Sequence, residues 1–512
     1  MQTLFLKGCG NCEARWSKTA FVFALHFWLF GLAAPAWALP LDLNGIAEAL
    51  LRNNTEIRSA ALDCQTATAQ LLSADGDFDP IFQITPETKT DYKLSKFIYD
   101  DPFWIESADS ISVAAKKKFP IGLTSEASWQ AIGIQSTSTQ SLLPKRTQSG
   151  VKFSLRQPLL RGGWQAANLF ETRKTEAQVL EYRARFEELV QAKYDEVSSL
   201  YWDLVSDDHE VSARKAAVKK AEGALEAIRR RCNSGTATRL DTLKAESALA
   251  LAEAGLEAAF GQRKNDEDRL LKEIIAPTEP LPGELMVQTE PLPLTDPELQ
   301  TFEDVPNTPP PAVASLQAQT AAARAALEKA KNAMLPRLDV DLSFSSVGMG
   351  KSLRGATTDV ATFENPSWNA AVSLSLPLYH LEPRGNRQAS QAQIDRLESE
   401  ATRERVRQSH EARLLEQELK LKQNRLSLLR QNSELAHEKV LVSEKFLRAG
   451  RISSLDFFDN LSAAADSESA FAREYSAFRQ VELKARSLRS TFLRTPEVQQ
   501  TLNKLCPVEL RH

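Results

Sequence analysis

Cysteine is scarce in this chain, and long apolar runs are absent after its first residues. Only five of the 512 residues are cysteines. The three beyond the N-terminal segment, Cys64, Cys232 and Cys506, are too scattered to predict a disulfide framework. No later stretch reaches the roughly 18 uncharged apolar residues that a membrane-spanning helix needs. These absences exclude a small disulfide-stapled protein and a bundle of transmembrane helices.

Signatures of catalysis and of nucleotide binding are also missing. The histidines are scattered, with neither an HExxH motif nor the spacing of a catalytic triad. The pair Gly162-Gly163 lacks the following Lys-Ser/Thr of a phosphate-binding loop. With a formal net charge of only -4, nothing indicates nucleic acid as a partner. We therefore expect no enzyme, no cofactor and no metal site, although an envelope enzyme stays an alternative that an activity screen would test.

The N-terminus has the three parts of a secretory signal. Lys7 and Arg15 belong to a basic region, residues 21–34 are apolar and uncharged, and Ala36-Trp37-Ala38 is a small-x-small cleavage site. The alternative is a single membrane anchor, for which the apolar run is too short. We therefore expect residues 1–38 to be a signal peptide. The cleavage site has no cysteine, so the sequence does not predict a lipid anchor there.

Two stretches without proline dominate the chain. Residues 165–232 and 388–447 contain no proline, and apolar residues such as Val179, Tyr182 and Phe186 recur at spacings of three and four. Sustained spacing of this kind is typical of coiled-coil packing. At about 1.5 Å per residue, each stretch predicts a helix roughly 90–100 Å long. No ordinary globular core needs helices of that length.

A short segment that ends each long helix occurs twice. Gly235-Thr236-Ala237-Thr238-Arg239-Leu240-Asp241 returns as Gly450-Arg451-Ile452-Ser453-Ser454-Leu455-Asp456. Glycine ends a helix, and Thr or Ser followed three residues later by Asp begins the next one with a capping box. The sequence therefore predicts two helical hairpins that turn at residues 233–240 and 448–455.

Shorter patterns indicate strands before each hairpin. Strict alternation in 151–156 ends at Pro158, and a matching strand at 372–376 ends at Pro377. With strands that begin near residues 78 and 336, this gives four strands, at about 78–158 and 336–377. We expect residues 95–150 to be an inserted loop, in which 110–129 is a candidate for an additional strand.

The order of elements predicts a duplicated protein. Ten prolines fall within residues 277–311, which cannot be regular helix or central strand. In each repeat, the helix before the strands and the helix after the hairpin turn together have about the length of the long helix. These two shorter helices can therefore lie end to end along it. The expected organisation is a first repeat at 39–275, a linker at 276–311, a second repeat at 312–495 and a C-terminal tail at 496–512.

This organisation resembles the TolC-like outer membrane efflux proteins. The features that carry the resemblance are the paired tip segments, the junctions Pro158-Leu159 and Pro377-Leu378, and the alanine-rich approach to Pro336. The resemblance implies a homotrimer in which a 12-stranded β-barrel is continuous with a 12-helix α-barrel. It implies a passive exit duct of a tripartite efflux or type I secretion system, set in outer membrane lipid and extending into the periplasm.

The resemblance also implies partners and sites. The partners would be a periplasmic adaptor and an inner-membrane pump of RND, ABC or MFS type. Asp456 and Asp459 match the acids that narrow the periplasmic mouth, although Asp456 has a capping role as its alternative. Lys244 stands where the first repeat would have the second acid. The predicted tip turns, which would also dock the adaptor, comprise Gly235, Thr238, Leu240, Asp241, Gly450, Ser453 and Leu455.

Two further interpretations stay open at this point. Basic residues in the last turns of the long helices, Arg229 to Arg231 and Lys445 with Arg448, either compensate helix dipoles or dock the adaptor. As a whole, the chain could instead be a soluble periplasmic coiled-coil scaffold, such as an adaptor. Its duplicated hairpins and strand–proline junctions argue against that alternative.

Overall fold

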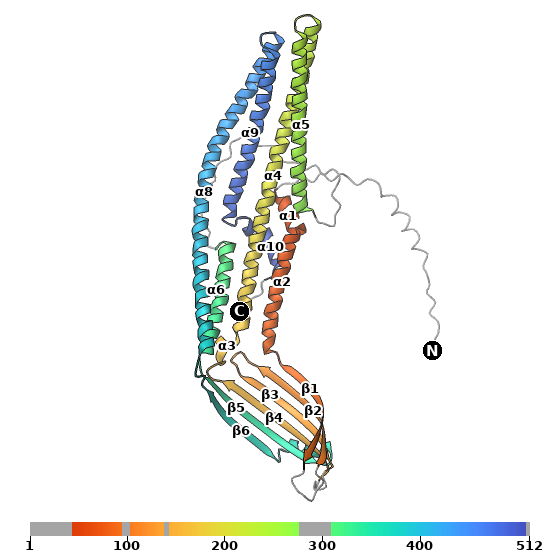
Figure 1. The fold of residues 1–512 in the computed structure, drawn as a ribbon, viewed down its shortest axis with the longest axis vertical. Helices are drawn as coiled ribbons and strands as arrows, with labels where there is room; N and C mark the ends of the chain where they lie inside the picture. The colour runs from red at the N-terminus through yellow and green to blue at the C-terminus, as the bar shows by residue number, and fades with distance from the viewer. Residues whose placement is uncertain (1–42, 95–102, 138–142, 276–308, 508–512) are drawn as a thin grey trace, which may run out of the picture.

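The structure, a computed structural model, describes residues 43–94, 103–137, 143–275 and 309–507. These residues form a long helical shaft, with a β-sheet at one end and the turns of two helical hairpins at the other (Figure 1). The predicted signal peptide and most of the predicted linker lie outside the described residues, so both stay predictions.

The shaft consists of helices of very different length. Among the described residues, the two longest are α4 (Phe170–Asn233) and α8 (Leu381–Arg448). The other helices are α1 (Leu43–Asn53), α2 (Thr55–Asp75), α3 (Trp164–Asn168), α5 (Arg239–Ile274), α6 (Pro311–Ala333), α7 (Leu353–Ala361), α9 (Ser454–Ser487) and α10 (Pro496–Leu505), with short 3₁₀ turns at Gly76–Phe78 and Phe492–Arg494.

The helices pack as predicted, two shorter ones along each long one. Helices α2 and α5 both contact α4, while α6 and α9 both contact α8. Since α4 also contacts α6 and α9, the wall runs α5–α4–α9–α8 near the tips and α2–α4–α6–α8 near the sheet. The helix that opens the first repeat is interrupted. Asn54 divides it, because its side chain caps α2 by accepting from the amides of Glu56 and Ile57.

The sheet corrects the prediction of four strands and an inserted loop. It contains six antiparallel strands in sequence order: β1 (Ile81–Leu94), β2 (Phe103–Lys118), β3 (Thr124–Ser136), β4 (Lys145–Pro158), β5 (Arg337–Gly350) and β6 (Pro366–Ser375). Strands β2 and β3 lie within residues 95–150. Their many Ser, Ala and Gly residues weaken the alternation of polar and apolar residues. They are strands because each has a paired neighbour on both sides.

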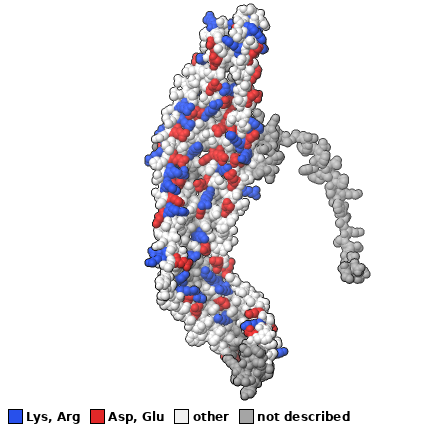
Figure 2. All heavy atoms as spheres, in the orientation of Figure 1, with Lys and Arg blue, Asp and Glu red and all other residues white. Residues whose placement is uncertain are grey.

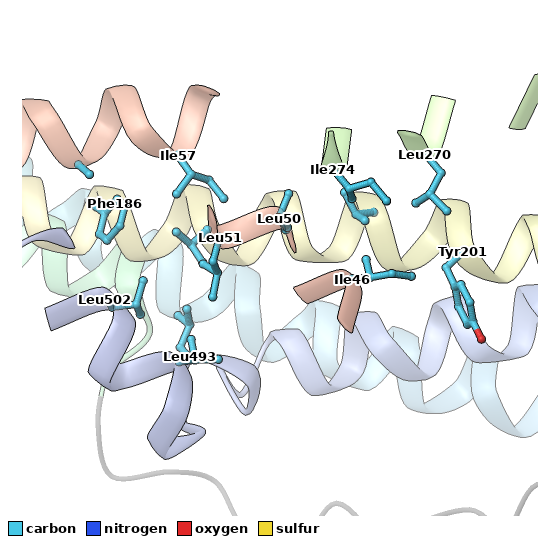
Figure 3. Close-up of a cluster of buried hydrophobic side chains, with 14 of the residues drawn as sticks. Ile46, Leu50, Leu51, Ile57, Phe186, Tyr201, Leu270, Ile274, Leu493 and Leu502 are labelled. Carbon is cyan, nitrogen blue, oxygen red and sulfur yellow. The ribbon is translucent and has the colours of Figure 1, made fainter. Parts of the chain in front are cut away.

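One hydrophobic cluster joins the middle of the shaft to the first and last helices of the described chain. Buried side chains of α1, α2, α4 and α5 meet residues from the C-terminal segment there (Figure 3). Burying each large apolar side chain stabilises the fold by roughly 1.5–3 kcal/mol. The labelled members are Ile46, Leu50, Leu51, Ile57, Phe186, Tyr201, Leu270, Ile274, Leu493 and Leu502.

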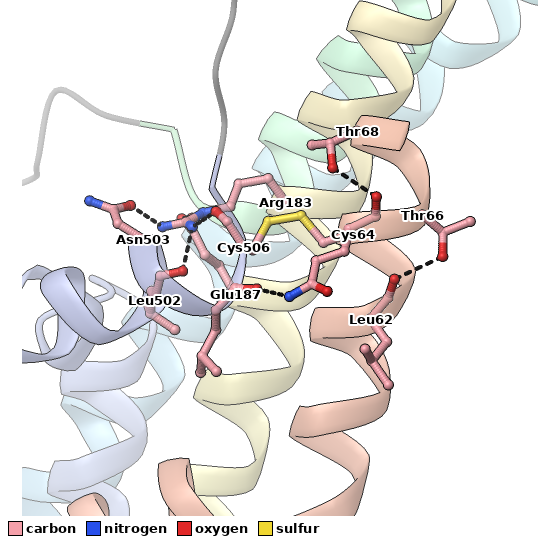
Figure 4. The surroundings of a disulfide bond; sticks show 11 residues. Leu62, Cys64, Thr66, Thr68, Arg183, Glu187, Leu502, Asn503 and Cys506 are labelled. Atoms are coloured by element: carbon pink, nitrogen blue, oxygen red, sulfur yellow. Dashed lines mark hydrogen bonds and ion pairs between the residues drawn. A yellow bond between two sulfur atoms is a disulfide. The ribbon is translucent and has the colours of Figure 1, made fainter. Parts of the chain in front are cut away.

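A disulfide bond between Cys64 and Cys506 corrects the expectation that the cysteines form no bridge. It joins α2 to the end of α10 across 442 residues (Figure 4). The guanidinium of Arg183 supports this end by donating to the carbonyl oxygens of Leu502 (2.9 Å) and Cys506 (2.7 Å). Sequence spacing alone could not show this pair, because α2 and the C-terminus meet only through packing on α4.

Candidate functional site: the two-faced sheet and the hairpin tips

One face of the sheet is apolar. The register places one residue of each strand side by side in a row across the sheet, and three members of this row are phenylalanines. The neighbouring rows add Ile84, Val113, Leu155, Leu342 and Val372. Many of these side chains are exposed, including 80% of Trp368 and 70% of Val372. The central row comprises Phe82, Ala115, Ala127, Phe153, Phe344 and Trp368.

The opposite face of the sheet is polar. An adjacent row of the same register contains Lys116, Glu126, Ser154, Ser343 and Asn369. A sheet with one apolar and one hydrated face is typical of a membrane β-barrel, in which the apolar face contacts lipid and the polar face lines the lumen. We call these the apolar face and the polar face below.

The predicted junctions between sheet and shaft form a compact turn. Strand β4 ends at Pro158, and the next amide, that of Leu159, donates to the carbonyl of Leu338 at 2.7 Å. Gly162 has a φ of +80°, which favours glycine, and its amide donates to the side-chain oxygen of Asn332 at 2.8 Å. Pro377 lies between β6 and α8, at the corresponding place in the second repeat.

The first hairpin tip has the predicted geometry. Gly235 follows α4 with a φ of +75°. Thr238 then caps α5, and both bonds of a capping box form between Thr238 and Asp241. The hydroxyl and the amide of Thr238 donate to the carboxylate and thereby lower the pKa of Asp241. Leu240, next to the cap, is 60% exposed.

The second tip departs from the first at its aspartate. Gly450 has a φ of +69°, and the Ser453 hydroxyl accepts from the amide of Asp456 at 3.3 Å. Within this described turn, the reciprocal hydrogen bond is not formed: the amide of Ser453 does not donate to the Asp456 carboxylate. The predicted capping box is therefore only half made. Asp456 and Asp459 are both exposed. The carboxylate of Asp456 is therefore available for a role other than capping.

A hydrogen bond joins the two hairpin tips, and its donor is Arg231, one of the basic residues; we call this contact the tie between the hairpins. The guanidinium of Arg231, at the end of α4, donates to the carbonyl oxygen of Leu447 at the end of α8, at 3.0 Å. This cation stabilises the C-terminus of the other hairpin's helix. By contrast, Arg229 pairs with Glu246 within the first hairpin, and Arg448 pairs with Glu444 on its own helix.

A carboxyl cluster inside the shaft was not predicted from the sequence. Asp203 and Asp207 of α4 face Asp266 of α5, in a groove that α9 borders. Asp203 accepts from Gln480 of α9 at 2.6 Å. Burial and the neighbouring Asp266 carboxyl raise the pKa of Asp207 from 3.8 to about 7. The acids lie on different helices, so no local motif marks them.

Positive and negative side chains are intermixed along the visible face of the shaft, without a large patch of one sign (Figure 2). Among the described residues, no helix has the length and apolarity to cross a membrane. In the same part of the chain, no group of three or more His, Cys, Asp or Glu residues has the arrangement of a metal site.

Comparison with known proteins agrees with this architecture. Residues 106–274 match the family model described as outer membrane efflux protein. No curated protein matches the chain.

Solved structures of outer membrane channels share the fold. The CmeC outer membrane channel of Campylobacter jejuni is 13% identical, with a TM-score of 0.62, and the match covers 91% of this chain and 89% of that one. The open state of the MtrE channel of Neisseria gonorrhoeae is 15% identical, with a TM-score of 0.57 and coverage of 92% and 91%. VceC of Vibrio cholerae is 13% identical, with a TM-score of 0.60 and coverage of 87% and 95%.

The two-faced sheet and the helical shaft give the chain the fold of these outer membrane proteins. Within residues 106–274, the similarity to the outer membrane efflux protein family agrees with the resemblance that the sequence indicates.

Proposed function

We propose that three copies of the chain form one closed channel, the exit duct of a tripartite efflux or type I secretion system. The observation that supports this most is that the described chain is an open wall. Its two long sides, β1 with α2 and α5, and β6 with α8, have no further neighbour among the described elements. A closed ring joins one side to the opposite side of the next copy.

The sheet edges require such closure in a membrane. Strands β1 and β6 end the sheet, and each has only one paired neighbour. Unpaired backbone amides and carbonyls are too costly in lipid, so a spanning sheet must close. Six strands are fewer than the eight of the smallest outer membrane barrels. Three copies would supply eighteen strands, in place of the twelve that the resemblance implied.

The helical sides carry complementary surfaces. Along α8, exposed apolar side chains recur every seven residues. On α5, the exposed residues Leu251, Ala254, Ala258 and Gly261 follow the 3–4 spacing of a coiled-coil seam. Small residues there leave room for large side chains of a second copy. The α8 stripe comprises Leu414, Leu421, Leu428, Leu435 and Val442.

The tips would meet the partners of the channel. Leu240 and Leu455 are exposed apolar residues at the ends of the two hairpins, and an exposed apolar side chain at a protruding turn suits a docking surface. The partners are a periplasmic adaptor and an inner-membrane pump of RND, ABC or MFS type. The pump supplies the energy, and the channel supplies a continuous aqueous path.

Asp456 and Asp459 form the periplasmic gate in this proposal. Both are exposed on the second tip, and three copies would bring six carboxylates to one constriction. A ring of carboxylates attracts cations, while its self-repulsion and hydration hinder other solutes. Asp241 does not share this role because its carboxylate is engaged in the capping box.

Single-channel conductance in a planar bilayer tests the proposal. Replacing Asp456→Ala together with Asp459→Ala should raise a small wild-type conductance, because the constriction loses its charges. The control variant combines Asp268→Ala with Asp395→Ala, two aspartates of the shaft helices, and should conduct like the wild type. A double tip variant indistinguishable from wild type would remove these aspartates from the gate. No conductance from any of the proteins would contradict the channel itself.

A further inference from the structure

Helix α7 lies on the apolar face of the sheet. It is part of the connection between β5 and β6, yet it packs on β5 and β4. Two residues of these strands are buried, Ser346 and Ser149. Each lies an even number of positions along its strand from a phenylalanine, Phe344 and Phe153 respectively. They therefore belong to the same face as the exposed phenylalanines, not to the polar face.

The sheet provides a specific seat for this helix. A side chain at Gly348 would collide with the carbonyl oxygen of Ala356, so only glycine permits the close approach. The hydroxyl of Ser346 donates to the carbonyl of Val360 at 3.5 Å. Beyond the helix, the ring of Phe363 packs against Phe344, with 5.8 Å between the ring centroids. The helix is thus fixed to the sheet rather than extended from it.

The level of α7 follows from the direction of β5. This strand begins beside the shaft at Arg337 and ends at Gly350. The apolar side chains that β5 contributes to the apolar face lie in the half nearer the shaft, up to Phe344, whereas α7 covers the far half. If the sheet spans the outer membrane with the shaft in the periplasm, α7 lies toward the cell exterior, on the outer part of the apolar face.

The outer surface of α7 is amphipathic. Leu353 and Phe363 are 46% and 49% exposed, and Lys351 and Arg354 are exposed beside Leu353. Apolar side chains next to basic ones are typical of helices that lie at the boundary between acyl chains and lipid headgroups. Aromatic residues likewise concentrate at this level in membrane barrels.

We propose that α7 is a lipid-binding interfacial helix on the outside of the channel wall. Leu353 and Phe363 enter the outer edge of the acyl layer, and Lys351 and Arg354 bind the phosphate groups of the lipids above it. The helix leaves the lumen free, because it occupies the face opposite the polar one. This inference rests on the proposed barrel.

Spin-label accessibility in lipid vesicles tests the position of α7. In a Cys232→Ser background that keeps the Cys64–Cys506 bridge, single labels are placed by Leu353→Cys and by Phe363→Cys. Collision rates with oxygen, which partitions into lipid, are compared with those of a water-soluble nickel chelate. Both labels should favour oxygen several-fold more than a lumen label does.

Two labels on β6 serve as matched controls. Val372→Cys is on the apolar face and Ser373→Cys on the polar face. If these two differ as expected but both α7 labels behave like Ser373→Cys, α7 does not contact lipid and the inference is overturned. If the two β6 labels do not differ, the barrel proposal itself fails. The two independent α7 positions guard against a single variant that does not fold.

Discussion

At the scale of single residues, the carboxyl cluster of the shaft contains an aspartate, Asp207, with a raised pKa. Asp207 has a carboxylate oxygen that is buried without a hydrogen-bond partner among the described residues. Its neighbours Asp203 and Asp266 carry the same charge, so ionising all three in one groove is unfavourable. The pKa of Asp207 is raised because burial disfavours its charged form and because a proton relieves this repulsion.

The raised pKa predicts a pH-dependent stability that Asp207→Asn removes. Between pH 3.8 and about 7, the folded state binds a proton that the unfolded state releases. The free energy of unfolding therefore falls as pH rises through this window. We expect the melting temperature of the wild type to be lower at about pH 8 than at about pH 5. This difference should be smaller in Asp207→Asn.

The exposed residue Asp268 provides the control for this prediction. It pairs with Lys264 on its own helix, so Asp268→Asn should leave the difference between the two pH values unchanged. The same loss of pH dependence in both variants would show that the cluster is not its source.

At the scale of elements, the tie between the hairpins joins one helix end to another. Because Arg231 donates to the Leu447 carbonyl, it holds the end of α4 against the end of α8. We expect Arg231→Gln to raise the single-channel conductance, because the second hairpin moves away from the first more readily. Arg229→Gln breaks a pair within the first hairpin only and should conduct like wild type. Equal conductance of both variants would contradict a role of this tie in gating.

The disulfide acts on another element, the C-terminal helix. Cys506→Ser releases α10 from α2, although the apolar contacts of Leu502 and the bonds from Arg183 are retained. A disulfide typically stabilises by about 2–4 kcal/mol, so we expect a lower melting temperature by circular dichroism. Cys232→Ser removes a free thiol and should melt like wild type. A reducing agent should lower the melting temperature of the wild type but not that of Cys506→Ser.

At the scale of the whole molecule, assembly depends on surfaces that one chain leaves uncovered. The α8 stripe would be buried only between copies, and a buried unpaired charge is costly there. We therefore expect Leu428→Glu to shift the purified protein in detergent from a trimeric to a monomeric mass by light scattering. Leu441→Glu changes an equally large exposed residue of α8 outside the stripe and should leave the trimer intact. A dimeric wild type, or a trimeric Leu428→Glu variant, would overturn the proposed ring.

Local patterns in the sequence predicted what depends on neighbouring residues. The proline-free stretches, the glycines at 235 and 450 and the capping residues Thr238 and Ser453 all act within a few positions, so the hairpins were predictable. Strict alternation likewise predicted the last part of β4 and the first part of β5. In the second tip, only the three-dimensional arrangement showed that Asp456 leaves its capping box half made.

The remaining features depend on partners far away in the chain, and only the tertiary structure decided them. Strands β2 and β3 are strands because backbone pairing on both sides outweighs their weak alternation. The Cys64–Cys506 bridge and the raised pKa of Asp207 require helices that α4 brings together. The sequence by itself determined the helical hairpins and their turns, because those rest on local backbone preferences. Which faces meet was decided by packing over hundreds of residues.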